Sequence, residues 1–167
     1  EVERGRLMRS RTAYPELYAR LKDLPLAVSR RTGTLLYMLA RRCRARGVVE
    51  FGTSFGLSTL HLAAAPRDNG GGLLVTSEFE PATLARAREN LAAAGPSDPV
   101  PFRAGDALHT LAADLPDPVD PALPDGANAP YTDILALVAH RLRPPALVLA
   151  HHALDSPPHI ARLRAPA

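Results

Sequence analysis

Short apolar runs and longer stretches with helical spacing alternate along this chain. The apolar runs are short enough for buried strands and lie at residues 47–51, 73–76 and 146–150. Helical spacing of apolar residues is found between and around these runs, at residues 30–46, 57–65, 81–94 and 131–142. Weaker patterns predict a third strand at 100–103 and a short helix at 106–113. This alternation predicts an α/β fold with a mainly parallel, doubly wound sheet and helices on both faces.

Both ends of the chain extend beyond this alternating region. Residues 7–21 have helical spacing with a break near Pro15, and Ser29 is a candidate N-cap of the helix at 30–46. We therefore expect three parts, an N-terminal helical lid or cap segment at 1–46, a ligand-binding domain at 47–156 and a tail at 157–167. We expect the first helix to form part of a lid or a dimer contact, and the Pro- and Ala-rich tail to be partly ordered.

The composition is typical of a soluble globular domain. The 167 residues fit one domain, and the single cysteine, Cys43, excludes an internal disulfide. No apolar run approaches the roughly 20 residues of a membrane-spanning helix, and the first six residues contain no apolar signal-peptide core. We therefore expect a cytoplasmic protein that does not act at a membrane.

The 20 basic residues are unevenly placed, with 12 of them and only four acidic residues in positions 1–46. Such asymmetry can indicate a nucleic-acid-binding arm. However, 19 of the 20 are arginines, so the bias follows the composition of the whole sequence, and cations also suit the C-terminal turn of the helix at 30–46. We favour a solvated basic helix face over an RNA or DNA footprint.

The best-defined candidate site is the turn at residues 52–56, between the first strand and the helix that follows it. Gly52 lets a ligand approach the backbone, and the helix start presents N–H groups to an anion. Glu78 ends the second strand, where an acid can accept hydrogen bonds from ribose hydroxyls, and Asp106 follows the third strand. These positions predict a site for adenosine with a short charged tail. The Gly-x-x-x-Gly spacing fits neither dinucleotide-binding nor phosphate-binding loops, which favours S-adenosylmethionine as the ligand.

Residues 48–59, Val-Val-Glu-Phe-Gly-Thr-Ser-Phe-Gly-Leu-Ser-Thr, resemble the first motif of class I S-adenosylmethionine-dependent methyltransferases. Within that class the motif is most similar to the O-methyltransferase branch of catechol and caffeoyl-CoA type enzymes. Four further segments occur in the order and spacing of that branch, at residues 24–29, 76–81, 105–107 and 142–144. The resemblance covers residues 17–156. It implies a Rossmann-like fold and an S-adenosylmethionine-dependent O-methyltransferase that acts on a small hydroxylated acceptor, aromatic acceptors included.

The resemblance also implies which residues surround the cofactor, namely Glu50, Gly52, Thr53, Ser54, Gly56, Ser58, Glu78, Phe79, Asp106 and Ala107. Glu50, Gly52 and Ser58 would surround its methionine end. Simpler roles stay open for two of these residues. Glu50 could be a strand-end acid bonded to nearby backbone, and Ser58 could cap the helix that it begins.

The nucleoside end of the cofactor would lie against the next two strands. By the resemblance, Glu78 would hold both ribose hydroxyls, with Phe79 against the face of the adenine. Asp106 and Ala107 would contact the adenine edge. A simple capping role for Asp106 stays open as well.

The catalytic half departs from the pattern of the branch. That branch builds a divalent-metal site from an Asp-Gly segment, matched here by Asp125 and Gly126, and a later Asp-Asn pair, replaced here by His151 and His152. Asn128 stands where the branch often has a lysine base. Three interpretations stay open. Asp125, His151 and His152 could bind a borderline metal such as zinc, nickel or iron. His151 could act beside Asp125 as a metal-free general base. Both histidines could also be ordinary strand-end residues of a silent protein.

Two segments depart from the fold that the resemblance implies. The strand before Asp125 should be central, yet residues 119–125 contain prolines, which are rare in central strands. This segment is therefore either a short, distorted strand or a loop. The chain also stops 17 residues after residue 150, where one or two further C-terminal strands are expected. We expect a trimmed or divergent member, or a partner chain over the exposed sheet edge.

The expected partners are a small-molecule acceptor and a second copy of the chain in a homodimer, and nucleic acid is not expected. The expected cofactor is S-adenosylmethionine, with a divalent metal as an open addition. Two alternatives to this enzyme remain. One is a catalytically silent S-adenosylmethionine-binding protein. The other is an RNA-binding protein or RNA methyltransferase that uses the Arg-rich N-terminal region.

Overall fold

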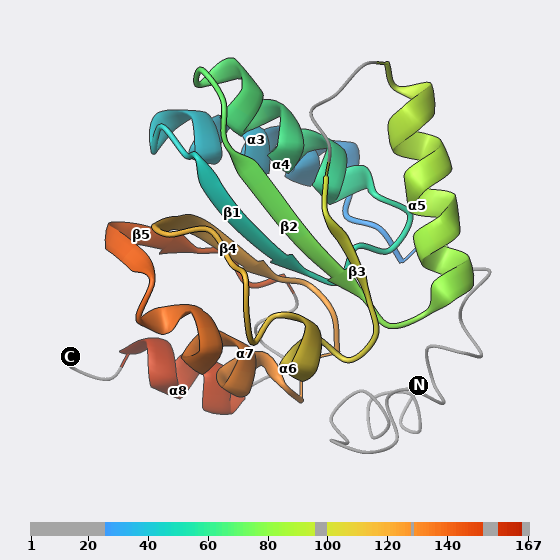
Figure 1. Cartoon of the computed structure of the whole chain (residues 1–167). Coiled ribbons are helices and arrows are strands. Elements are labelled where there is room, and N and C mark those ends of the chain that lie inside the picture. The colour runs from blue at the N-terminus through green and yellow to red at the C-terminus, as the bar shows by residue number, and fades with distance from the viewer. Residues whose placement is uncertain (1–25, 96–99, 128, 152–156, 165–167) are drawn as a thin grey trace.

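A parallel sheet with helices on both faces forms the part of the chain that the structure describes (Figure 1). The computed structural model describes residues 26–95, 100–127, 129–151 and 157–164. The strands in these ranges are β1 (Gly47–Phe51), β2 (Leu73–Glu78), β3 (Phe102–Ala104), β4 (Val119–Pro124) and β5 (Leu142–Val148). They lie in the order β3-β2-β1-β4-β5, and every neighbouring pair is parallel. The expected α/β, Rossmann-like arrangement is confirmed.

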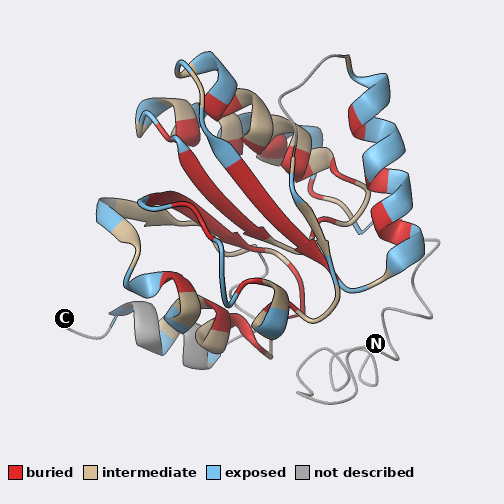
Figure 2. Ribbon diagram, viewed as in Figure 1, coloured by how far each residue is buried: buried red, intermediate tan, exposed pale blue. Residues whose placement is uncertain are grey.

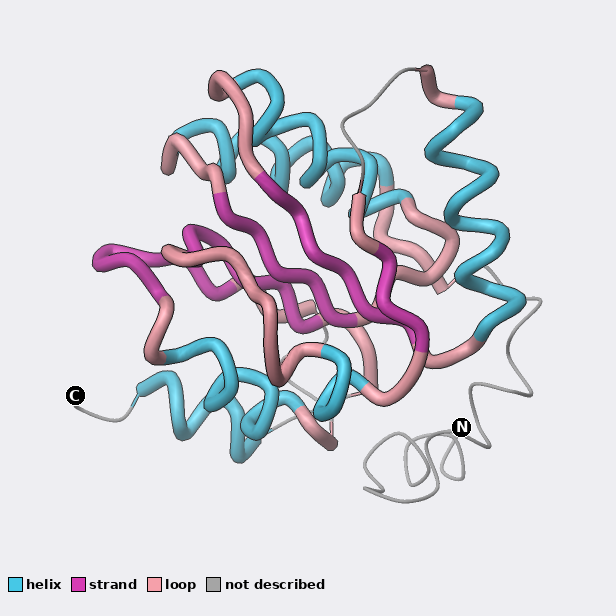
Figure 3. Tube along the Cα trace, viewed as in Figure 1, coloured by secondary structure: helices cyan, strands magenta, loops and turns pink. Residues whose placement is uncertain are grey.

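The helices form two layers. They are α3 (Arg30–Arg42), α4 (Leu57–Asp68), α5 (Pro81–Ala93), α6 (Ala107–Thr110), α7 (Tyr131–Ala139) and α8 (Pro157–Arg164). The first three lie on one side of the sheet, and α6, α7 and α8 lie on the other (Figure 3). None of the described helices is long and apolar enough to span a membrane. The helix expected at 7–21 lies outside the described residues.

Successive residues of the central strands face opposite layers. Val48 and its register partner Leu74 pack in the apolar cluster that includes α3 and α4. Val49 and its partner Val75 pack in the cluster that includes α6 and α7. Both strands are therefore buried on both faces (Figure 2). This burial explains why they read as continuous apolar runs rather than as an alternating pattern.

The segment with the prolines is a strand, so the loop interpretation is wrong. β4 lies between β1 and β5, and Ala122 is paired with Val49 of β1. Its register with β5 shifts between Val119 and Pro121. The additional residues lie on β5 between Leu142 and Leu147, and proline has no N–H to donate to a ladder. The strand thus keeps its central place with a local distortion, as the other interpretation expected.

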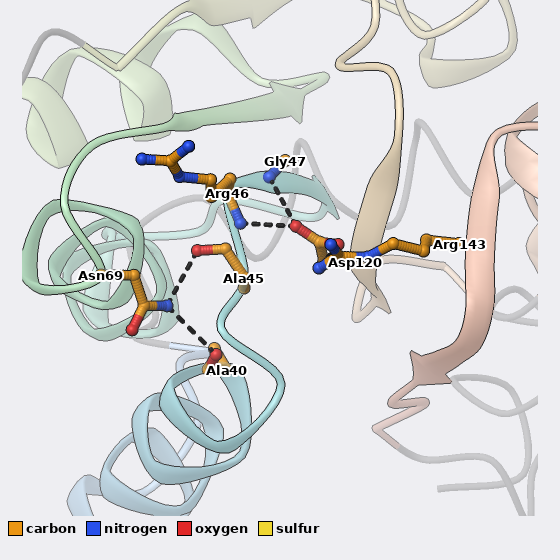
Figure 4. A network of polar contacts seen from close by, with 7 residues as sticks. All are labelled: Ala40, Ala45, Arg46, Gly47, Asn69, Asp120 and Arg143. Atoms are coloured by element: carbon orange, nitrogen blue, oxygen red, sulfur yellow. Dashed lines mark hydrogen bonds and ion pairs between the residues drawn. The ribbon is translucent and has the colours of Figure 1, made fainter.

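Asp120 supplies polar contacts at the amino end of β4 (Figure 4). Its buried Oδ2 accepts hydrogen bonds from the backbone N–H groups of Arg46 and Gly47, the latter at 3.0 Å. Its Oδ1 forms an ion pair with Arg143 of β5. Nearby, the Asn69 side chain donates to a carbonyl of the segment between α3 and β1 (2.8 Å). Asp120 therefore links three adjacent strands where the proline weakens the ladder.

Some element boundaries differ from the sequence prediction. The helix expected at 30–46 ends at Arg42, because Arg44 adopts a φ of 51° and the chain turns there into β1. Leu142 fits helical spacing but belongs to β5. The expected tail contains helix α8, which packs against α7. The division of the chain at residues 46 and 156 stays a prediction.

Candidate active site

The turn after β1 lies close to the segments that follow β2 and β4. Gly52 has a φ of 95°, and its N–H donates to the carbonyl of Ser77 in β2 (3.0 Å). A Cβ atom at Gly52 would lie 2.6 Å from the backbone nitrogen of Gly126, which follows Asp125 after β4. Only glycine fits this conformation and this approach. The turn and Asp125 are therefore neighbours at the carboxyl edge of the sheet.

The Glu78 carboxylate is joined to the same turn. The backbone N–H of Ser54 donates to its Oε2 (2.8 Å), and the N–H of Glu80 donates to its Oε1 (3.0 Å). Glu78 is only 8% exposed, and burial raises the pKa of its carboxyl while these backbone bonds oppose the rise. The structure thus brings Glu78 beside the turn, as the ligand hypothesis requires.

Helix α4 begins at this turn without a side-chain cap. Its N-cap, Gly56, has a left-handed φ of 86° and no side chain that could accept from the first-turn N–H groups. The side chain of Asn90 on α5 donates to the Phe55 carbonyl (2.9 Å) and so links the turn to α5. Ser58, in the first turn of α4, is buried. The helix start is therefore suited to an anionic ligand group.

Glu50 is a fully buried carboxyl group at the end of β1. Its Oε2 accepts hydrogen bonds from the hydroxyls of Thr59 (2.6 Å) and Thr76 (2.7 Å). Its Oε1 accepts no hydrogen bond from the described residues. Burial raises the pKa of Glu50 to about 7, and the hydroxyls of Ser58, Thr59 and Thr76 oppose that rise. A buried oxygen of this kind suits a cationic ligand group.

Thr53 lies behind the turn. Its hydroxyl is 2.6 Å from that of Thr76, and its N–H donates to the carbonyl of Ser77 (3.3 Å). The sequence analysis included Thr53 among the cofactor contacts but missed Thr59 and Thr76. In the sequence, a threonine whose methyl group packs in the core looks the same as a threonine whose hydroxyl bonds a buried acid.

The residues expected around the adenine lie at the ends of β2 and β3. Phe79 is 38% exposed, and Ala107 is buried at the start of α6. Asp106 accepts from the N–H of Leu108 (2.9 Å), so it does cap α6, as the simpler interpretation expected. The N–H of Gly105 donates to the Glu78 carbonyl (2.9 Å) and draws the two strand ends together. The adenine contacts themselves stay a prediction.

Asp125 and His151 form a direct pair. The His151 Nδ1 lies 2.6 Å from the Asp125 Oδ1, and the Asp125 side chain is only 6% exposed against 33% for His151. Burial raises the pKa of Asp125 to about 7 and lowers that of His151, so it disfavours the charged form of each. At this separation the two groups are hydrogen bonded to each other. The pair can orient an imidazole for acid–base chemistry.

Tyr131 holds the two segments that carry this pair. Its buried hydroxyl has one hydrogen, which lies within reach of the carbonyls of both His151 (2.9 Å) and Gly126 (3.2 Å). Its ring meets Phe51 edge to face, with 6.2 Å between the ring centroids. Sequence analysis placed Tyr131 only as the start of a helix, since a tyrosine gives no sign of which backbone its hydroxyl will reach.

Two of the three expected metal ligands, Asp125 and His151, lie within the described residues. Among the described residues, no group of three or more His, Cys, Asp or Glu side chains is arranged to hold a metal ion. Asp125 and His151 provide two donors that are already bonded to each other. His152 and Asn128, which entered the metal and base hypotheses, lie outside the described residues.

A parallel α/β sheet with buried acids and a glycine turn at its carboxyl edge defines a nucleoside-binding domain. The family model described as a methyltransferase domain, Methyltransf_24, matches residues 49–153, and the chain belongs to this family. The chain is 33% identical over 132 residues to a catechol O-methyltransferase from Niastella koreensis, covering 77% of this chain and 59% of that protein. It thus spans little more than half the length of that relative.

Solved structures support the same family. The cofactor-bound structure of Rv0187 from MTB superimposes with a TM-score of 0.77 at 27% identity, covering 92% of this chain and 78% of that one. An O-methyltransferase from Bacillus cereus in complex with SAH superimposes with a TM-score of 0.71 at 26% identity, covering 84% of this chain and 66% of that one. The expected resemblance to S-adenosylmethionine-dependent O-methyltransferases is confirmed.

Proposed function

We propose that this chain carries the cofactor-binding and catalytic site of an S-adenosylmethionine-dependent O-methyltransferase with a small hydroxylated acceptor. One observation carries the proposal, the meeting of two buried carboxyl groups at one glycine turn. Glu50 has an oxygen that accepts no hydrogen bond from the described residues, and Glu78 is bonded to the turn through Ser54. The family membership and the complex of a similar O-methyltransferase with SAH support this assignment.

The residues at this edge match the cofactor group by group. The Glu50 Oε1 suits the ammonium group, and the uncapped start of α4, with Ser58, suits the carboxylate. The Glu78 carboxylate, which is held by the backbone N–H groups of Ser54 and Glu80, suits the ribose hydroxyls as an acceptor. Phe79 offers an exposed ring to the adenine face, with Asp106 and Ala107 at its edge.

The catalytic proposal concerns proton transfer from the acceptor. S-adenosylmethionine, when bound, supplies a methyl group on a positively charged sulfur. With the His151 Nδ1 donating to Asp125, Nε2 is the basic nitrogen of the neutral ring and takes the proton of the acceptor hydroxyl. Asp125 fixes the tautomer and stabilises the imidazolium that forms. Binding both reactants at one edge supplies the alignment that displacement requires.

Two measurements test this function. Calorimetry with S-adenosylmethionine should show one binding site per chain. If the protein does not bind this ligand, the assignment is overturned. Methyl transfer to catechol-type acceptors should then continue in the presence of a chelator. A strict dependence on added divalent metal would refute the metal-free base. Binding without transfer to any hydroxylated acceptor would instead favour a silent binding protein.

A further inference from the structure

Four fully buried polar side chains form one connected group behind the turn. Glu50 lies on β1, Thr53 lies in the turn, Thr59 lies on α4 and Thr76 lies on β2, and all four are 0% exposed. Burying hydroxyl and carboxyl groups in a sheet core costs free energy unless they are hydrogen bonded. Every hydroxyl here is within 2.7 Å of another oxygen of the group.

The number of hydrogens fixes the direction of each bond when Glu50 is ionised. A carboxylate only accepts, so Thr59 and Thr76 each donate to Oε2. The single hydroxyl hydrogen of Thr76 is then used, so Thr53 must donate in the contact of 2.6 Å between the two hydroxyls. Oε2 therefore receives two donors, while Oε1 receives no hydrogen bond from the described residues, although the Ser58 hydroxyl lies close enough to lower the pKa of Glu50.

We infer that Thr59 and Thr76 are positioning residues for the amino-acid tail of the cofactor: by occupying Oε2 from two elements, they fix the Glu50 carboxylate with Oε1 as the acceptor for the ammonium group. Thr53 donates a hydrogen bond to the Thr76 hydroxyl and does not contact Glu50 through a hydrogen bond of its own. This inference rests on the proposed function. It assigns the three threonines a role in recognising the tail and none in recognising the nucleoside.

The test compares ligands with and without the tail. S-adenosylhomocysteine has the ammonium group, and 5′-methylthioadenosine lacks the whole amino-acid end. Thr76→Val and Thr59→Val keep the side-chain shape and remove the donor. Each should weaken S-adenosylhomocysteine binding roughly 10- to 100-fold, the range for a hydrogen bond to a charged group, and leave 5′-methylthioadenosine binding unchanged. Thr76→Ser, which restores the hydroxyl, should restore the affinity for the tail. Thr53→Val should have a smaller effect.

Thr110→Val is the matched control. The Thr110 hydroxyl lies 2.6 Å from that of Ser77, in a partly buried contact of the same length that does not involve Glu50. This variant should bind both ligands as the wild type does. Thermal unfolding checks that each variant is folded. Because Thr59 lies on α4 and Thr76 lies on β2, one variant still tests the inference if the other fails to fold.

The outcomes separate this inference from the proposed function. Unchanged S-adenosylhomocysteine affinity in folded Thr76→Val and Thr59→Val would overturn the inference while the function stands. Equal loss of both ligands would also overturn it, since that pattern indicates general damage. A wild-type protein that binds neither ligand would overturn the function and the inference together.

Discussion

The Nδ1 of His151 lies 2.6 Å from the Oδ1 of Asp125, although 26 positions separate them in the sequence. Their contact follows from the sheet, because β4 and β5 are parallel neighbours and both residues lie just beyond the carboxyl ends of these strands. The His151 N–H also donates to the Pro124 carbonyl (3.3 Å). The histidine thus occupies a position that the fold itself directs towards the buried acid.

The first prediction concerns this pair. His151→Gln and Asp125→Asn should each lower kcat for methyl transfer by roughly 100- to 10,000-fold, the usual contribution of a general base. Neither should change S-adenosylhomocysteine affinity more than slightly, since neither side chain is proposed to bind the cofactor. Initial rates and calorimetry measure the two effects. His140→Gln, at an exposed position that follows α7, is the control and should retain full activity. Full activity in His151→Gln would exclude the histidine as base.

The second prediction concerns Tyr131. Tyr131→Phe keeps the ring and removes the buried O–H that bonds the carbonyls of His151 and Gly126. Leaving buried carbonyls without a donor should lower the free energy of unfolding by about 1 to 3 kcal/mol. It should also lower kcat more than cofactor affinity, because the displaced segments carry His151 and Asp125.

A second tyrosine provides the comparison for that variant. The Tyr37 hydroxyl donates to Asp68 (2.9 Å) in an exposed position, where water can replace the bond. Urea denaturation of Tyr37→Phe should therefore show less than about 1 kcal/mol of change. Equal losses in the two variants would show that burial does not set the cost.

The sequence predicts the part of the site at the ends of β1 and β2 better than the part at the ends of β4 and β5, for physical reasons. Glu50, Gly52 and Glu78 lie at the ends of continuous apolar runs, and β1 and β2 are buried on both faces, so position along the run fixes position at the sheet edge. β4 was ambiguous because its prolines argue against a central strand. Asp120, which compensates for the weakened ladder, looks in the sequence like any turn aspartate.

The side-chain hydrogen bonds of the site also cannot be predicted from the sequence. Thr59 and Thr76 reach Glu50 only after α4 and β2 pack against β1, and Tyr131 reaches His151 only after α7 docks on the sheet. Such contacts depend on three-dimensional approach and leave no periodic signal. They nevertheless decide how the acids of the site are oriented.

The third prediction concerns pH. Burial raises the pKa of Glu50 from 4.5 to about 7 in the folded chain, so the native state keeps a proton that the unfolded chain releases over this range. The contribution of Glu50 to the free energy of unfolding therefore falls as pH rises from 4.5 to about 7 and is constant above it. Glu50→Gln should remove this contribution and reduce the loss of stability between about pH 5 and about pH 8.

Urea denaturation at the two pH values measures that difference. Asp125 has a pKa raised in the same direction, so Asp125→Asn should also reduce the loss, and the double variant should reduce it further. His151, whose pKa burial lowers, acts in the opposite direction below its ordinary range, and Glu50→Gln leaves its contact with Asp125 in place. An unchanged pH dependence in Glu50→Gln would show that its carboxyl does not titrate as burial dictates.

The fourth prediction separates two functions of Asp120 at the amino end of β4, the end of the sheet opposite the site. Asp120→Ala leaves the N–H groups of Arg46 and Gly47 without their acceptor, and should lower the free energy of unfolding by about 2 to 4 kcal/mol. Arg143→Gln removes only the ion pair and leaves both backbone bonds to Asp120 Oδ2 in place, so it should cost less than Asp120→Ala, although it leaves the buried Oδ1 without its partner. Both variants should bind S-adenosylhomocysteine normally while folded. Urea denaturation and calorimetry provide these values. If Arg143→Gln cost as much as Asp120→Ala, the ion pair rather than the two backbone bonds would hold β1, β4 and β5 together.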